Sequence, residues 1–165
     1  MNFLIREAHP ADADAMHQMI VDLAIYEREP DAVLATPADL QAALFSSEKS
    51  GKSAPALYAQ VAEVDGEVVG MAIWFLNYST WLGTHGIYLE DLYVKPEHRG
   101  PGVGKALLKQ LARVCIEKGY TRFQWWVLDW NEPAIEFYRS HGAVAMDEWV
   151  VYRLSGDALE SFAKD

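Results

Sequence analysis

The sequence contains one cysteine, Cys115, in 165 residues, so no internal disulfide can form. It also lacks any apolar run near the ~18 residues of a membrane-spanning helix, and residues 1–6 are too short an apolar stretch for a signal peptide. Basic residues are few, with 14 Lys and Arg against 24 Asp and Glu and a net charge of −10, which disfavours nucleic-acid binding. We therefore expect a cytoplasmic protein with one domain over 1–165, a buried Cys115, and neither nucleic acid nor membrane as a partner.

The residues that are present predict alternating strands and helices. Apolar strand-length runs predict strands at 3–6, 56–64, 67–76, 87–94 and 121–128, with further strands at 144 and 149–154. Helical spacing and capping residues predict helices beginning at 10, 36, 103, 131 and 156. Asp65-Gly66 favours a two-residue hairpin, and residues 77–86 are predicted to form a connecting loop. The fold class that follows is α+β, a mixed and mostly antiparallel central sheet with helices on both faces.

A glycine-rich turn between a strand and a helix is the most informative stretch. The strand Ile87–Val94 is stopped by Lys95-Pro96, and Arg99-Gly100-Pro101-Gly102-Val103-Gly104 then leads into an amphipathic helix. Such a turn exposes backbone N–H groups at the positive end of the helix, an arrangement suited to phosphate. The pattern of a P-loop fails at Arg99 and Ala106, and that of a dinucleotide-binding loop fails at Lys105, which leaves R-x-x-G-x-G.

Two further motifs accompany this turn. Tyr88-Leu89-Glu90-Asp91 precedes it, and Asp129-Trp130-Asn131-Glu132-Pro133 with Phe137-Tyr138 follows it. Together with R-x-x-G-x-G they resemble the GNAT superfamily of N-acetyltransferases, in the branch that contains the spermidine/spermine (diamine) and thialysine enzymes. The resemblance implies the acyl-CoA N-acyltransferase fold and acetyl-CoA as co-substrate, with no metal. It also implies a homodimer whose carboxyl-terminal region, near Trp149, completes the partner's substrate site.

The resemblance also implies roles for single residues. Tyr138 is the general acid for the coenzyme sulfur, and Glu90, acting through water, takes the proton of the amine. On the sequence alone, Tyr138 could equally pack its helix on the sheet, and an ordinary strand carboxylate is the favoured interpretation of Glu90. The candidate coenzyme-binding residues surround the turn and the later helix start: Leu92, Tyr93, Val94, Arg99, Gly100, Pro101, Gly102, Val103, Gly104, Lys105, Asn131, Glu132, Pro133, Ala134 and Tyr138. The candidate residues for the amine acceptor are Tyr26, Glu27, Ser79, Trp81, Glu90, Asp91, Trp125, Trp126 and Trp149.

The chemistry of amine acetylation makes further demands on the strand. An amine of lysine type has a pKa near ~10.4, so a base must take its proton at neutral pH. Glu90 and Asp91 are neighbours, and simple alternation points their side chains to opposite faces unless the strand is bulged. Backbone amides near 92–94 are suitably close to the turn to stabilise a tetrahedral oxyanion. No Cys-His or Ser-His pair suggests a covalent enzyme intermediate, so direct attack of the amine on the thioester is expected.

The acceptor is less closely specified. The spermidine/spermine enzymes carry an aspartate where this chain has Ser79, in the segment Tyr78-Ser79-Thr80-Trp81, so one anionic contact for a distant ammonium is missing. This predicts thialysine, lysine-like amino acids or short diamines as acceptors, with a polyamine N1-acetyltransferase as the alternative. Two other interpretations stay open, because fold alone does not fix a substrate. One is a non-catalytic sensor of acyl-CoA, and the other is an enzyme that acts on protein N-termini or antibiotics.

Overall fold

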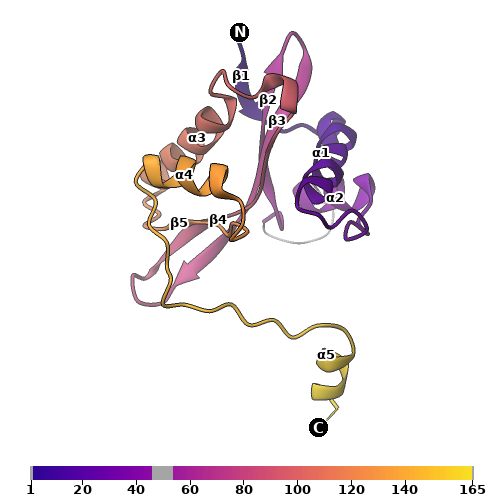
Figure 1. The fold of residues 1–165 in the computed structure, drawn as a ribbon, viewed down its shortest axis with the longest axis vertical. Helices are drawn as coiled ribbons and strands as arrows, with labels where there is room; N and C mark the ends of the chain where they lie inside the picture. Colours follow the sequence, from indigo (N-terminus) through magenta and orange to yellow (C-terminus); the bar gives the residue numbers. More distant parts are fainter. Residues whose placement is uncertain (1, 46–53, 165) are drawn as a thin grey trace. The chain divides into compact units, whose positions relative to one another are not determined.

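The computed structural model describes residues 2–45 and 54–164, and contacts divide the chain into two compact units. The first unit is Met1–Trp126 and the second is Val127–Asp165, and each is described by itself. The first unit holds the sheet and the helices that cover it, and the second holds two short helices (Figure 1). A single domain over 1–165 therefore stays a prediction.

The first unit is built on a five-stranded sheet whose strands lie side by side in chain order. β1 (Leu4–Glu7), β2 (Tyr58–Val64), β3 (Glu67–Ser79) and β4 (Thr84–Val94) pair antiparallel, and β5 (Phe123–Gln124) pairs parallel with β4. Hairpins can join antiparallel neighbours, whereas the parallel step from β4 to β5 needs a helical crossover, which is α3 (Val103–Lys118). The predicted mixed, mostly antiparallel sheet is confirmed.

Helices cover both faces of this sheet, as predicted (Figure 1). α1 (Ala13–Tyr26), which follows a short 3-10 turn η1 (Pro10–Asp12), and α2 (Pro37–Phe45) pack on one face, and α3 packs on the other. The α1 and α2 face is filled by Met16, Met19, Leu40, Leu44, Ala59, Val61, Val68, Met71, Ile73 and Tyr93. The α3 face is filled by Ala62, Val69, Ala72, Trp74, Ile87, Leu89, Val94, Val103, Leu107, Leu111 and Cys115, so the predicted burial of Cys115 is confirmed.

Local capping and turn residues set the element boundaries. The Thr36 backbone N–H donates to Asp39 Oδ2 at 2.8 Å and Asp39 N–H donates to Thr36 Oγ1 at 3.2 Å, a reciprocal cap at the start of α2. Asp65 and Gly66 both have positive φ, 50° and 85°, as the predicted two-residue hairpin turn requires. Gly119, at φ 69°, ends α3 in the left-handed region.

Three predicted boundaries were wrong. Residues 77–79 and 84–86 are not loop but continue the β3–β4 ladder, in which Asn77, Tyr78 and Ser79 pair with Gly86, His85 and Thr84. The predicted strand 121–128 shortens to β5, whose pairing with β4 stops at Tyr88. A bulge in β4 just beyond that point, at Glu90, bends the strand and disrupts the ladder, so the parallel pairing does not continue.

The second unit contains α4 (Glu132–Ser140) and α5 (Gly156–Phe162), close to the predicted ranges. The strands predicted at 144 and 149–154 are wrong for this structure, because strand character needs a partner that supplies ladder hydrogen bonds. A turn instead precedes the second segment, where Trp149 N–H donates to the Met146 carbonyl at 3.0 Å. The side chains of Val150 and Tyr152 are 75% and 93% exposed.

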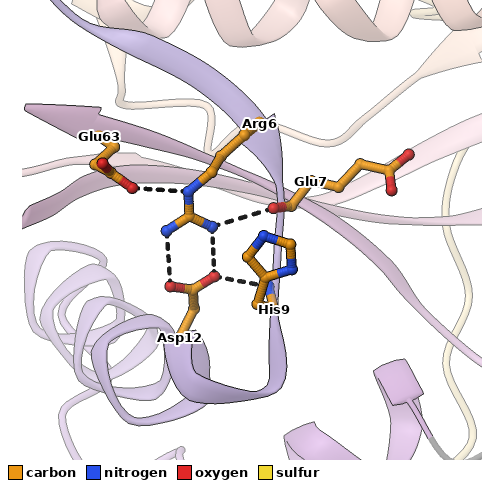
Figure 2. Close-up of polar contacts among 5 residues, drawn as sticks. All are labelled: Arg6, Glu7, His9, Asp12 and Glu63. Carbon is orange, nitrogen blue, oxygen red and sulfur yellow. Dashed lines mark hydrogen bonds and ion pairs between the residues drawn. The ribbon is translucent and has the colours of Figure 1, made fainter. Parts of the chain in front are cut away.

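An ion-pair network joins the first strand to the start of α1 (Figure 2). The Arg6 guanidinium donates to both Asp12 carboxylate oxygens, at 2.7 and 3.0 Å, and its Nε donates to Glu63 Oε2 at 2.7 Å. The backbone N–H of His9 adds a fourth bond, to Asp12 Oδ2 at 2.7 Å. These hydrogen bonds, chiefly those from Arg6, hold the pKa of the buried Asp12 below its ordinary value. The network fixes the amino-terminal end of the helix whose other end carries Tyr26 and Glu27.

We expect Arg6→Met to lower the free energy of unfolding by about 2–4 kcal/mol at pH 7, because Asp12 would stay buried without its cation. Because the folded-state pKa of Asp12 is depressed, its stabilisation is present above the unfolded value and is lost as pH falls through the folded value. The difference from wild type should therefore shrink in acid. Urea titrations at pH 7 and pH 3 measure the difference. Lys95→Met, which breaks the more exposed pair with Glu67, is the control and should lower stability much less than Arg6→Met does. Equal losses in the two variants would contradict this view of the network.

Candidate active site

The glycine-rich turn leaves the amino-terminal end of α3 open. Gly102 is the N-cap at φ 91° with no side-chain capping bond, and the first helical bond runs from Ala106 N–H to the Gly102 carbonyl at 2.9 Å. The N–H groups of Val103, Gly104 and Lys105 therefore have no acceptor within the helix. A Cβ added at Gly100 or Gly102 would meet nothing within 4 Å, so the protein leaves these two positions of the turn uncrowded. The turn thus fits the pyrophosphate of a coenzyme.

The edge of β4 next to this turn has no neighbouring strand in the described part of the chain. β5 pairs only with Ile87 and Tyr88, so the edge of β4 opposite β3 lacks a strand partner from Leu89 to Val94. The Val94 carbonyl, at the end of this edge, accepts a hydrogen bond from Arg99 Nε at 2.8 Å. Lys95 N–H donates to the Val69 carbonyl of β3, so alternation along β4 turns the backbone groups of Leu92 and Val94 to the open edge, where such groups can bind an amide-bearing ligand or donate to an oxyanion.

A β-bulge separates the two acidic residues of β4. Ile73 pairs with Asp91 and Trp74 pairs with Leu89, so Glu90 is an extra residue without a partner across the ladder. The bulge leaves Glu90 exposed and turns the half-buried Asp91 to the α1 side of the sheet, the side that Ile73 faces. The sequence had implied that Glu90 and Asp91 can act on the same substrate only if the strand is bulged, and this is that bulge.

Glu27, Glu90 and Asp91 form an acidic cluster, and the pKa values of two of these carboxyl groups are raised there. Burial, followed by the negative charges of Glu90 and then Glu27, raises the pKa of Asp91 to about 7. Burial also raises the pKa of Glu27. A carboxyl group that titrates near neutrality can accept a proton and pass it to water under physiological conditions.

The carboxyl-terminal end of α1 meets the glycine-rich turn through Arg99. The guanidinium carbon of Arg99 lies 5.8 Å from the centre of the Tyr26 ring and 5.3 Å from that of Tyr93. One planar cation thus contacts two aromatic rings and the end of β4, which links the predicted coenzyme turn to the helix that carries Tyr26 and Glu27. The structure brings these residues together although more than 60 positions of sequence separate Tyr26 from Tyr93.

Three aromatic side chains extend from this acidic cluster, and two of them were missed in the sequence. Phe75 stacks on Tyr88 with ring centres 4.9 Å apart, and Trp126 meets Tyr88 edge-on at 5.7 Å. Tyr88 stands in the Tyr-Leu-Glu-Asp motif, but only the register, which places it opposite Phe75, shows which face it occupies. Trp125 packs instead with the core on the α3 face, beside Phe123 at 4.9 Å, so the two neighbouring tryptophans do not act on the same side.

The tip of the β3–β4 hairpin is not brought to the acidic cluster. Ser79 is 7% exposed, and its Oγ accepts a hydrogen bond from Leu82 N–H at 3.3 Å, while Trp81 is 89% exposed. Ser79 pairs with Thr84, so it lies on the order of 20 Å along β4 from Asp91 at ~3.4 Å per residue. Within one chain, a small acceptor cannot touch both places.

The remaining predicted residues belong to the second unit. Asn131 is the N-cap of α4 without a side-chain capping bond, and Glu132, Pro133 and Ala134 form the first turn of that helix. Tyr138 lies in its second half, with its ring centre 5.6 Å from that of Phe137. Trp149 is 66% exposed.

Metal-binding clusters and membrane-spanning helices are both absent from the part of the chain that the structure describes. Over residues 2–45 and 54–164, no three His, Cys, Asp or Glu side chains gather in a way that could hold a metal ion. In the same described ranges no helix combines the length and the hydrophobicity needed to cross a bilayer.

Comparison with known proteins gives consistent matches. Residues 18–143 match the sequence profile of the Acetyltransferase (GNAT) family. The chain is 38% identical to a thialysine N-epsilon-acetyltransferase of Sus scrofa, over 97% of this chain and 96% of that protein. It is 30% identical to the L-ornithine N5-acetyltransferase NATA1 of Arabidopsis thaliana, over 97% and 87%. Among solved structures, an integron cassette protein from the mobile metagenome of V. cholerae superimposes with a TM-score of 0.79 at 25% identity, over 100% and 99%.

Proposed function

The chain belongs to the acetyltransferase (GNAT) family, and from that premise we propose that it transfers the acetyl group of acetyl-CoA to a primary amine of a small cationic acceptor. The acceptor class that we propose is thialysine, a lysine-like amino acid or a short diamine. The observation that carries this choice is the acidic cluster of Glu27, Glu90 and Asp91, which lies beside the open edge of β4. Carboxylates attract an ammonium group, and two relatives are named for amino acids with a side-chain amine.

Within this proposal, the acidic cluster manages the proton of the amine. Asp91, with its pKa raised to about 7, takes the proton, and the exposed Glu90 passes it to solvent through water. The family resemblance implied Glu90 as the base; because of the bulge and the partial burial of Asp91, we divide that task between the two residues. The neutral amine then attacks the thioester carbonyl, and backbone N–H groups of the open β4 edge stabilise the oxyanion.

The coenzyme thiolate is the leaving group of this reaction. We assign its protonation to Tyr138, because a phenol hydroxyl can donate a hydrogen bond, and then its proton, to the thiolate as the carbon–sulfur bond breaks. The turn amides of 103–105 hold the pyrophosphate, so that the thioester lies beside the strand edge. No bond to the enzyme forms in this sequence of steps.

We further propose that the protein is a homodimer in which Trp149 reaches the partner's acceptor site. Large apolar side chains of the second unit support this, since Trp149, Tyr152 and Phe162 are 66%, 93% and 74% exposed, and such surfaces commonly mark interfaces. Light scattering at micromolar concentration measures the mass, and a monomer would refute the proposal.

The proposed function is tested with a panel of amines. We expect thialysine, lysine, ornithine and C3 to C5 diamines to release coenzyme A thiol from acetyl-CoA with higher kcat/KM than spermine does. Ser79→Asp supplies the missing anion at the hairpin tip and should raise activity on spermine. If spermine is the best substrate of the wild type, the polyamine alternative replaces this assignment. Coenzyme binding without turnover on any amine would favour a sensor of acyl-CoA.

A further inference from the structure

An aromatic surface adjoins the acidic cluster on the same side of the sheet. Because β3 runs regularly through Ile73 and Phe75, both side chains face the α1 side, and so do their cross-strand partners Asp91 and Tyr88. The Glu90 bulge absorbs the extra residue of β4, so that Asp91 and Tyr88 stay on one face although they are three positions apart.

The spacing of these groups follows from the register. Ile73 and Phe75 are two residues apart on one strand, which separates Asp91 and Tyr88 by about 7 Å along the strand direction. With bonds of ~1.5 Å, a chain of four or five carbons spans about this distance. The Trp126 ring meets the Tyr88 ring at nearly a right angle, with ring centres 5.7 Å apart and an interplanar angle of 84°.

The aromatic surface is accessible and has the right electrostatic character. Trp126 is 58% exposed, and Tyr88 is half-buried between Phe75 and Trp126. The face of an aromatic ring attracts a cation, and tryptophan does so most strongly. Two rings at right angles present one face and one edge, so an ammonium group can lie against a face while the aliphatic part of the ligand packs on the other ring.

We propose that Tyr88 and Trp126 form the subsite for the second positive group of the acceptor, at the distance from Asp91 that a four- or five-carbon chain spans. This rests on the proposed function, because it takes Asp91 as the place where the reacting amine binds. It makes Trp126 a residue that sets acceptor length, and it gives a structural reason for a preference for short diamines and lysine-like amino acids.

The test compares two acceptors of equal length, 1,5-diaminopentane and n-pentylamine, which differ only in the second amine. In the wild type the diamine should have the higher kcat/KM. Trp126→Leu should lower kcat/KM for the diamine about threefold to tenfold, through KM rather than kcat, and should lower it less for n-pentylamine, which has no second positive group. Trp126→Phe is the matched control, because it keeps an aromatic face and should retain most of the preference.

A second variant and a binding measurement keep the outcomes distinct. Trp126→Lys places a cation in the subsite and should reduce the preference for the diamine more than Trp126→Leu does. Calorimetric titration of 1,5-diaminopentane should show the same order of affinities without turnover. An unchanged ratio of the two acceptors in both variants would overturn the subsite, even if the wild type is active on amines. If the wild type acetylates neither amine nor any other in the panel, the proposed function fails first.

Discussion

Asp91→Asn is expected to lower kcat/KM for the amine by about 10²-fold to 10⁴-fold, the range for the loss of a general base. The substitution keeps the size of the side chain and the bulge at Glu90, but asparagine cannot accept the proton. Initial rates with saturating acetyl-CoA and limiting amine measure the loss. Because the wild-type base must be ionised, kcat/KM should rise about tenfold per pH unit below the Asp91 pKa of about 7 and level off above it.

The pH profile separates Asp91 from its neighbour. Asp91→Asn should abolish the inflection near pH 7, whereas Glu27→Gln should move it to lower pH, because one of the charges that raise the Asp91 pKa is removed. If Glu90 were the base, Glu90→Gln would cause the larger loss of kcat/KM and the inflection would persist in Asp91→Asn. That result would contradict the assignment.

Stability provides an independent readout of the same group. The folded-state pKa of Asp91 lies above the unfolded value, so its ionisation opposes folding as pH rises from ~3.9 to about 7. Asp91→Asn removes this cost and should therefore be more stable than wild type at pH 8, but not at pH 3. Thermal unfolding at the two pH values measures this difference in stability. If Asp91 is a functional carboxylate, the variant should be both less active and more stable than wild type at pH 8.

Gly102→Val is expected to weaken coenzyme binding by about 10²-fold, because the added bulk directly precedes the amides of 103–105 and obstructs the close approach that one or two charge-assisted hydrogen bonds need. The direct measurement is calorimetric titration with coenzyme A. The backbone at Gly102, with φ 91°, is also a conformation that valine rarely adopts, so part of the effect can come from a disturbed turn.

Gly66 offers a matched control for that strain. It has nearly the same φ, 85°, and a Cβ there would likewise meet nothing within 4 Å, but it lies in the β2–β3 hairpin turn. Gly66→Val should therefore destabilise the fold by a similar amount and leave the affinity for coenzyme unchanged. If either valine variant does not fold, the alanine pair at the same positions makes the same comparison. Equal affinities in the two variants would refute the coenzyme site.

Much of this protein could be predicted because its signals are local. The reciprocal cap of Thr36 and Asp39, the Asp65-Gly66 turn and the left-handed Gly119 each depend on residues within a few positions, so they appear in the sequence in the form they have in the structure. The same holds for the strand, turn and helix around Gly102, and hence for the family. Helical spacing likewise predicted α1 and the amphipathic α3, both of which pack on the sheet.

Tertiary structure alone decided how distant segments meet. The Glu90 bulge is defined only by the pairing of β4 with β3, and without that pairing it is undecided which faces of the sheet Glu90 and Asp91 occupy. The raised pKa of Asp91 depends in part on Glu27, which comes from another element. The early end of β5, the contact of Arg99 with Tyr26, and the meeting of Tyr88 with Trp126 are equally non-local. Caps, turns and periodicity are fixed by short-range sterics and hydrogen bonds, whereas register and burial arise when strands far apart in the sequence pair, which no short segment encodes.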